Sequence, residues 1–214
     1  MKILVLHHPS LTPPEKPKNK EEWESAPWKT EYDVIQALRK LKHEVLALGV
    51  DYDLKPIRET IENFKPKIVF NLLEEFAGEA IFDQNVVSYL QMLRVPYTGC
   101  KPRGLMLSRD KALAKKILNY HRIPTPHFYV FPKSKKIKIL KGTRFPLFVK
   151  SLNEEASLGI TQDSIVSDKD QLLERIKYYQ EKYDADVIAE DYIDGREFYV
   201  ALMGSKRVQT YPVW

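Results

Sequence analysis

The sequence predicts an α/β protein made of two domains. Short apolar runs alternate along almost the whole chain with segments whose apolar residues recur every three or four positions, as strands and helices do. The 214 residues are enough for two small domains, each with its own core. After Gly99 the regular strand–helix–strand order changes to one long helical segment followed by strands and loops. We therefore place one domain at residues 1–99 and a second at residues 100–214.

The first domain is expected to be Rossmann-like, because four apolar strands alternate with three helices. A polar segment follows the first strand at residues 9–29, and its Trp23 and Trp28 indicate that part of it packs down. Thr30 begins a capping box for the first helix, and Pro66 ends the second helix. The predicted strands are Ile3–Leu6, Glu44–Leu48, Ile68–Leu72 and Val95–Thr98, and the predicted helices carry Val34, Ala37, Leu38 and Leu41, then Ile57, Ile61 and Phe64, then Val86, Val87, Leu90 and Leu93.

The second domain is expected to begin with a helical segment from Leu105 to Tyr120, with Ser108 as an N-cap inside it. A capping box that begins at Ser167 predicts another helix, through residues 172–179. Gly204-Ser205 is a two-residue turn signal, so the last two strands are expected to pair as a hairpin. The predicted strands are His127–Phe131, Phe145–Lys150, Ser164–Val166, Val187–Ile193, Phe198–Met203 and Val208–Val213.

Composition narrows the possible partners. Lys and Arg number 34 against 29 Asp and Glu, and the formal charge of +5 suits either an anionic small ligand or nucleic acid. The strongest basic cluster, residues 133–138, lies in a predicted loop without interleaved aromatic residues, which favours a solvated loop over a nucleic-acid site. No apolar run approaches the length that crosses a bilayer. We expect neither a nucleic-acid nor a membrane partner.

The single cysteine, Cys100, excludes an internal disulfide and a cysteine-rich metal site. It has no recognisable partner for nucleophilic catalysis, so we expect a buried small residue in a protein of the reducing cytoplasm. The five histidines share no zinc-site spacing with acidic residues. We assign no residue of the chain to metal binding or to catalysis.

Two lysines are placed to bind phosphate groups. Lys150 ends an apolar strand, and Lys111 lies in the first turn of a helix. The helix dipole favours an anion at that position, so a cation there is best explained by a bound anion. Between the lysine strand and Gly159, small residues allow backbone N–H groups to approach phosphate oxygens, and Ser157 adds a hydroxyl donor.

Together with two carboxylates near residue 190, these segments resemble the ATP-grasp superfamily, and within it the D-alanine–D-alanine ligases. The resemblance implies a pre-ATP-grasp amino-terminal domain followed by the first lobe of an ATP-grasp domain. The segments that carry it are residues 108–111, 148–150, 156–159 and 190–197. It further implies that seven residues bind ATP, namely Lys111, Lys150, Ser157 and Gly159 at the phosphates and Glu190, Ile193 and Glu197 at the nucleoside.

The resemblance also implies a reaction, in which ATP activates a carboxylate as an acyl phosphate and an amine captures it. The substrates would be small and amino-acid-like, and such ligases are commonly homodimers. The family's Mg²⁺ ligands come from a later stretch, so we expect them beyond Trp214. The chain reads as a truncated front half that supplies the nucleotide site and is inactive alone.

Several residues depart from the D-alanine–D-alanine ligase pattern. Asn71 stands where a histidine is usual, Glu155 and Ala156 replace a glycine and a serine, and the amino-terminal glutamate motif is missing after His8. These departures leave the D-alanine substrate open. They also keep two alternatives, a degenerate or regulatory ATP-binding module without catalysis and a basic nucleic-acid-binding protein that uses Lys135, Lys136 and Lys138.

Overall fold

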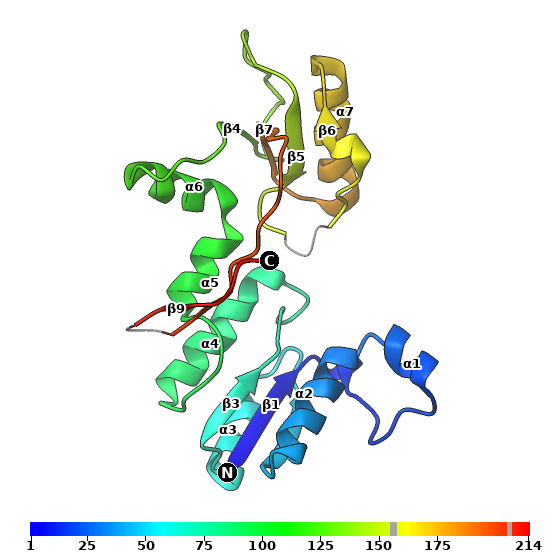
Figure 1. Ribbon diagram of the computed structural model, residues 1–214, viewed down its shortest axis with the longest axis vertical. Coiled ribbons are helices and arrows are strands. Elements are labelled where there is room, and N and C mark those ends of the chain that lie inside the picture. Colours follow the sequence, from blue (N-terminus) through cyan, green and yellow to red (C-terminus); the bar gives the residue numbers. More distant parts are fainter. Residues whose placement is uncertain (155–157, 205–206) are drawn as a thin grey trace. The chain divides into compact units, whose positions relative to one another are not determined.

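The computed structural model describes residues 1–154, 158–204 and 207–214, and it has the predicted α/β fold (Figure 1). Contacts divide the chain into two compact units. The first unit is Met1–His121 together with Leu152–Leu158, and the second is Arg122–Ser151 together with Gly159–Trp214. Compact units need not coincide with domains, so the domain boundary expected after Gly99 stays a prediction.

The first unit contains a three-stranded parallel sheet with the order β2-β1-β3. Three of the four predicted strands are confirmed. The fourth, at residues 95–98, is reduced to one parallel bridge between Val69 and Tyr97, next to Pro96, which has no N–H to donate. The strands are β1 (Lys2–His7), β2 (Glu44–Gly49) and β3 (Ile68–Asn71).

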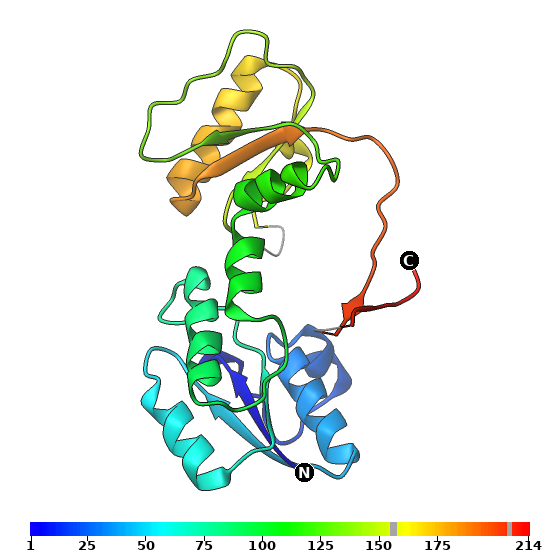
Figure 2. The same cartoon turned by 90° about the vertical axis from the view of Figure 1, so that its left-hand side faces the viewer.

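Helices cover both faces of this sheet, as Figures 1 and 2 show. Because side chains alternate along a strand, Ile3 and Val5 pack against α2, whereas Leu4 and Leu6 pack against α3 and α4. All four of these β1 side chains are buried. A short 3-10 turn, η2, leads into α4. The elements are α2 (Lys29–Lys40), α3 (Lys55–Phe64), η2 (Ala80–Phe82) and α4 (Asp83–Met92).

The segment between β1 and α2 is more ordered than a polar loop. It contains a 3-10 turn, η1 (Pro9–Leu11), and a short helix, α1 (Lys20–Ser25). Asn19 caps α1, since its side chain accepts a hydrogen bond from the Glu22 N–H at 2.8 Å. Trp23 and Trp28 are half-buried, as expected of a segment that packs down.

The capping box predicted at Thr30 is wrong. Helix α2 begins one residue earlier, at Lys29, so Thr30 lies inside it, and the N-cap Trp28 makes no side-chain capping bond. The buried face is also rotated from the prediction. Ile35 is 3% exposed, whereas Leu41 lies just past the helix end and is 66% exposed.

The predicted helical segment 105–120 is broken in the middle. It forms two helices, α5 (Pro102–Arg109) and α6 (Lys111–Tyr120), with Asp110 in extended conformation between them. Asp110 caps α6, because its carboxylate accepts the Leu113 N–H at 2.8 Å. Ser108 is not the cap, since its hydroxyl donates to the Leu105 carbonyl within α5.

This arrangement predicts different effects for two substitutions two residues apart. We expect Asp110→Ala to lower the free energy of unfolding by about 0.5–2 kcal/mol, the usual cost of losing an N-cap. Ser108→Ala removes an exposed hydroxyl and should change stability by less than about 0.5 kcal/mol. Urea unfolding followed by circular dichroism would measure both. Equal destabilisation by the two variants would contradict the assignment of the cap.

The second unit is built on a four-stranded antiparallel sheet with the order β4-β7-β5-β6. One face packs on α7 (Lys169–Tyr183), whose Leu172, Ile176 and Tyr179 are fully buried. Asp168, rather than the expected Ser167, caps α7 by accepting the N–H groups of residues 170 and 171. The strands are β4 (Phe128–Phe131), β5 (Leu147–Ser151), β6 (Ile165–Val166) after the 3-10 turn η3 (Gln162–Ser164), and β7 (Val187–Asp191).

The last strands pair antiparallel, as the hairpin prediction requires, but over a shorter length. They are β8 (Leu202–Met203) and β9 (Gln209–Thr210). Met203 pairs with Gln209, so residues 204–208 form the connection instead of the predicted two-residue turn. Of the two turn residues, Ser205 lies outside the described residues.

Two further observations concern the surface. Cys100 is exposed, which corrects the expectation of a buried thiol. Within residues 1–154, 158–204 and 207–214, no helix combines the length and the apolar character that crossing a membrane requires.

Candidate functional site

The two predicted phosphate-binding lysines lie in different compact units, and each is described within its own. Lys150 lies on β5, and Glu190 lies on the neighbouring strand β7. The register pairs Phe148 with Glu190, so Lys150 and Glu190 point from the same face of the sheet, opposite to the face that packs on α7. The sequence prediction that these two residues belong to one site is therefore consistent with their shared face.

The side chains of Lys150 and Glu190 form an ion pair. The ammonium also lies 5.5 Å from the centroid of the Phe148 ring. The side chains are 23% and 10% exposed, so the pair is largely shielded from solvent. A buried carboxylate and ammonium that neutralise each other are stable together, and either one alone would be costly.

Lys111 holds the main chain that follows β5. Its Nζ donates hydrogen bonds to the carbonyls of Leu152 at 3.2 Å and Glu154 at 2.5 Å. These carbonyls belong to the start of the segment predicted to cover phosphates. Lys111 thus positions that segment in the structure as it stands, in addition to the phosphate role predicted for it.

Gly159 is required by its backbone conformation. Its φ is +71°, in the left-handed region, and a Cβ there would lie 2.9 Å from Tyr183 Cε2 and 3.1 Å from Tyr179 Cε1. Its carbonyl accepts a hydrogen bond from Arg175, a buried residue of α7 that also donates to Ser164 at 2.9 Å. The structure thus explains the glycine by its positive φ and by tyrosine rings, and the predicted approach to phosphate stays a prediction.

Two tyrosines of α7, Tyr178 and Tyr183, perturb each other's pKa, and the second of them lies beside Gly159. A hydrogen bond with Tyr183, and then one with Lys182, lowers the pKa of the Tyr178 phenol below its ordinary value. The same contact with Tyr178 raises the pKa of the Tyr183 phenol. The two phenols lie 3.3 Å apart.

We expect Gly159→Ala to destabilise the protein by about 1–2 kcal/mol from backbone strain alone, with a further cost from the ring contacts. Gly195→Ala is the matched control, since a Cβ at Gly195 meets nothing within 4 Å and its φ is not in the left-handed region. That variant should remain within about 0.5 kcal/mol of the unchanged chain. Thermal unfolding of both would check this, and equal melting temperatures would argue against the conformational role of Gly159.

The other predicted nucleotide contacts follow β7 without regular structure. Ile193 is 68% exposed, two residues past the end of the strand, which is shorter than the predicted Val187–Ile193. Glu197 is exposed, and its carboxylate accepts the Tyr199 hydroxyl at 3.5 Å. Ser157 lies outside the described residues.

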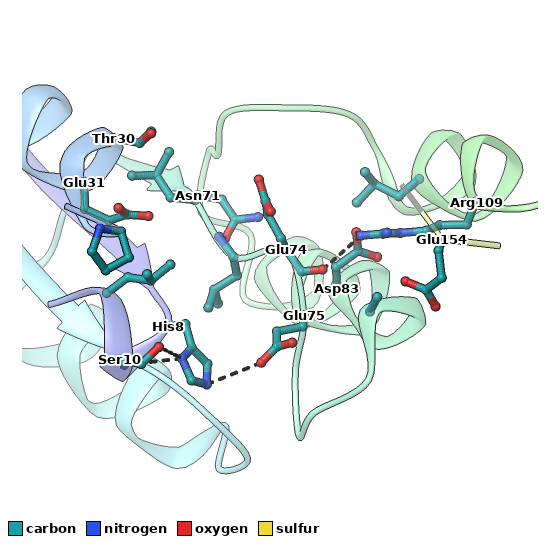
Figure 3. A pocket seen from close by; sticks show the side chains of 16 residues that line it. His8, Ser10, Thr30, Glu31, Asn71, Glu74, Glu75, Asp83, Arg109 and Glu154 are labelled. Carbon is teal, nitrogen blue, oxygen red and sulfur yellow. Dashed lines mark hydrogen bonds and ion pairs between the residues drawn. The ribbon is translucent and has the colours of Figure 1, made fainter. Parts of the chain in front are cut away.

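A cavity of about 780 Å³ lies in the first unit (Figure 3). It opens where β1 and β3 end, so His8 and Asn71 line it, and α2, α4 and α5 complete its wall. The carboxyl ends of parallel strands are the usual place for a ligand in an open α/β sheet. The sequence analysis did not predict most of the side chains that line it.

Among the missed residues are an acidic residue on α2 and an ion pair between α4 and α5. Glu31 is 4% exposed although it is charged. Asp83 and Arg109 are similarly buried and form an ion pair at 2.8 Å. Arg109 Nη2 also donates to the Glu74 carbonyl at 2.9 Å. Glu31 falls on the apolar side of the α2 pattern, one turn before Ile35, and that position was the signal available in the sequence.

In the described part of the chain, no three His, Cys, Asp or Glu side chains are grouped so that they could hold a metal ion. This applies also to the acidic residues around the cavity. None of the described residues is therefore assigned to Mg²⁺.

Comparison with known proteins shows which protein family the chain resembles. The family model described as D-ala D-ala ligase C-terminus matches residues 115–214. Over 188 residues the chain is 30% identical to a D-alanine–D-alanine ligase of Moorella thermoacetica. This alignment covers 84% of this chain and 58% of that ligase. The chain is similar to the D-alanine–D-alanine ligases.

A second relative carries no functional name. Over 188 residues the chain is 35% identical to an uncharacterized protein y4sG of Sinorhizobium fredii. The alignment covers 84% of this chain and 53% of that protein. The ligase-like chain thus spans little more than half the length of the curated relatives it matches.

Solved structures share the fold. A D-alanine–D-alanine ligase from Coxiella burnetii superimposes with a TM-score of 0.70 at 17% identity, covering 100% of this chain and 70% of that one. A D-alanine–D-alanine ligase from Bacillus anthracis complexed with ATP gives a TM-score of 0.65 at 23% identity, covering 99% and 70%. The ATP-grasp fold expected for the ligase-like chain is confirmed.

Proposed function

We propose that this chain supplies the nucleotide-binding part of an ATP-dependent carboxylate–amine ligase. The observation that carries the proposal is the shared sheet face of Lys150 and Glu190, in a chain with D-alanine–D-alanine ligase relatives. In the proposed reaction ATP activates a carboxylate as an acyl phosphate, and an amine then displaces phosphate to form an amide bond.

The phosphate end of the site would use the two lysines. ATP carries up to four negative charges, so ammonium groups held by rigid elements suit its phosphates. Lys150 is fixed on β5, and Lys111 on the first turn of α6. Ser157 and Gly159 would cover the phosphates from the intervening loop. When ATP engages Lys150 and Lys111, its oxygens take the place of Glu190 and of two main-chain carbonyls.

The nucleoside end would use the strand β7 and the chain after it. Glu190 would accept a hydrogen bond from the exocyclic amine of adenine, and the main chain at Ile193 would read the ring edge. Glu197 would accept the two ribose hydroxyls, which a carboxylate can do simultaneously. Glu197 is exposed in the structure and therefore accessible to a nucleotide.

Mg²⁺ is expected to accompany ATP, where it would neutralise phosphate charge. The described residues do not form a metal site, so the contacts with ATP proposed above are made by the chain itself. The homodimer and the cytoplasmic location remain predictions of the sequence.

Calorimetric titration of ATP and ADP, with Mg²⁺, into the chain tests this function. Saturable binding of both nucleotides is expected. ATP binding without ADP formation by a longer protein that contains this chain, even in the presence of substrates, would fit the regulatory-module alternative. If neither nucleotide binds while an oligonucleotide does so in a salt-dependent manner, the proposal fails in favour of nucleic-acid binding.

A further inference from the structure

The cavity of the first unit is lined mainly by acidic groups. Among its described lining residues, five carboxylates face one guanidinium and one histidine. Arg109 is paired with Asp83, and His8 lies 3.4 Å from Glu75, so both basic groups already have acidic partners. The acidic residues are Glu31, Glu74, Glu75, Asp83 and Glu154.

Two of these carboxylates carry an oxygen that is buried without a hydrogen-bond donor. They are Glu31 Oε2 and Asp83 Oδ1, on side chains from α2 and α4 that are 4% and 5% exposed as residues. Arg109 satisfies the other oxygen of Asp83. Buried acceptors are normally satisfied, so each of these two oxygens lacks a donor that a ligand or an ordered water can supply.

The two oxygens lie at separate places on the cavity wall. Figure 3 shows Glu31 beside Thr30 on one side, and Asp83 beside Arg109 toward the other. Arg109 neutralises Asp83, and the other four carboxylates leave the lining with a net negative charge, which two cationic groups balance better than one.

The rest of the lining is suited to an alkyl chain between the two donors. The cavity volume of about 780 Å³ lies within the range of organic ligand sites and is far larger than a single metal ion needs. Apolar side chains also line the cavity, and they can contact methylene groups. These are Leu11, Pro27, Leu72, Leu73, Ala80 and Leu105.

We propose that this cavity binds an organic dication, in which an alkyl chain joins two ammonium groups, as in a diamine or a basic amino acid derivative. The inference rests on the proposed function, where this molecule is the amine substrate. One nitrogen, as the free amine, forms the C–N bond to the acyl carbon, loses a proton, and displaces phosphate as the C–O bond breaks. The second ammonium remains on the carboxylates.

Calorimetry with three ligands of equal length tests the proposal on the full chain. We expect 1,5-diaminopentane to bind at least about tenfold more tightly than pentylamine, since it places two cations among the carboxylates instead of one. Glutarate, which has two carboxylates, should not bind. Equal affinity for the diamine and the monoamine, or binding of glutarate, would overturn the inference. So would Mg²⁺ alone displacing the diamine at equal concentration.

Matched substitutions locate the binding. Glu31→Gln keeps the shape of the side chain and should weaken diamine binding by about tenfold to a hundredfold. Glu74→Gln, at the exposed rim, is a second variant that should weaken binding less and leaves the buried residues intact. Glu62→Gln, on the exposed side of α3, should have no effect. Unchanged affinity in both cavity variants would overturn the proposal.

ATP titrations keep this inference apart from the proposed function. ATP binding without diamine binding would remove only the inference about the amine. Diamine binding that depends on Glu31, without ATP binding, would uphold the cavity and remove the ligase function.

Discussion

Lys150→Ala is expected to weaken ATP binding by about tenfold to a hundredfold, which corresponds to the loss of charge-assisted hydrogen bonds to phosphate. The substitution removes the ammonium that β5 presents on the sheet face opposite to α7. Calorimetric titration of ATP into the variant and the unchanged chain would measure the difference. Salt should weaken binding to the unchanged chain more strongly than binding to the variant.

Two controls are needed, because Lys150 also neutralises the buried Glu190. Lys138→Ala removes an exposed lysine from the basic loop and should leave ATP affinity unchanged. Circular dichroism would show whether the Lys150→Ala variant keeps its fold. A folded Lys150→Ala variant with full ATP affinity would refute the nucleotide site on this sheet face.

Arg109→Ala is expected to lower the free energy of unfolding by about 3–5 kcal/mol, because it leaves the buried Asp83 carboxylate without its cation. It also removes the donor to the Glu74 carbonyl. Urea unfolding would measure the change.

Two further variants separate charge from size. Arg103→Ala, on the exposed side of the same helix α5, should change stability by less than about 0.5 kcal/mol. The double variant Arg109→Met with Asp83→Leu replaces both charges by apolar groups and should recover most of the lost stability. A double variant as unstable as Arg109→Ala would show that packing rather than charge is decisive.

The parallel sheet of the first unit was predictable because its strands are continuous apolar runs. In β1 all residues from Ile3 to His7 are buried, since helices cover both sheet faces. The second sheet alternates instead, as in β5, where Leu147 and Val149 are buried and Phe148 and Lys150 less so. Lys150 was proposed as a site residue because it ends the apolar run that begins at Phe145, and this role stays a prediction.

Helix starts were predicted less well, because several side chains near each start can serve as a cap. Thr30, Ser108 and Ser167 all fit a capping pattern, yet the chain uses Asp110 and Asp168 at two of these positions and no side chain at the third. A shift of one or two residues depends on packing of the whole helix. Local sequence does not encode that packing.

The acidic cavity was missed for a different reason. A charged residue in a helix is ordinarily read as part of its solvated face, so Glu31 was missed although it lies one turn before Ile35 on the apolar side of α2. The role of Glu31 and Asp83 depends on α2, α4 and the strand ends meeting in space, which follows from the order β2-β1-β3 and not from spacing along the chain.

The exposed thiol of Cys100 affects how the association of this protein can be measured. A chain with one cysteine can form one covalent link to a second chain, so air oxidation produces dimers and no larger species. Such a crosslinked dimer would have the mass of the homodimer that the family resemblance leads us to expect. Sedimentation or light scattering therefore needs a reductant or the Cys100→Ser variant. The same solitary thiol also offers one defined attachment point for a fluorescent label.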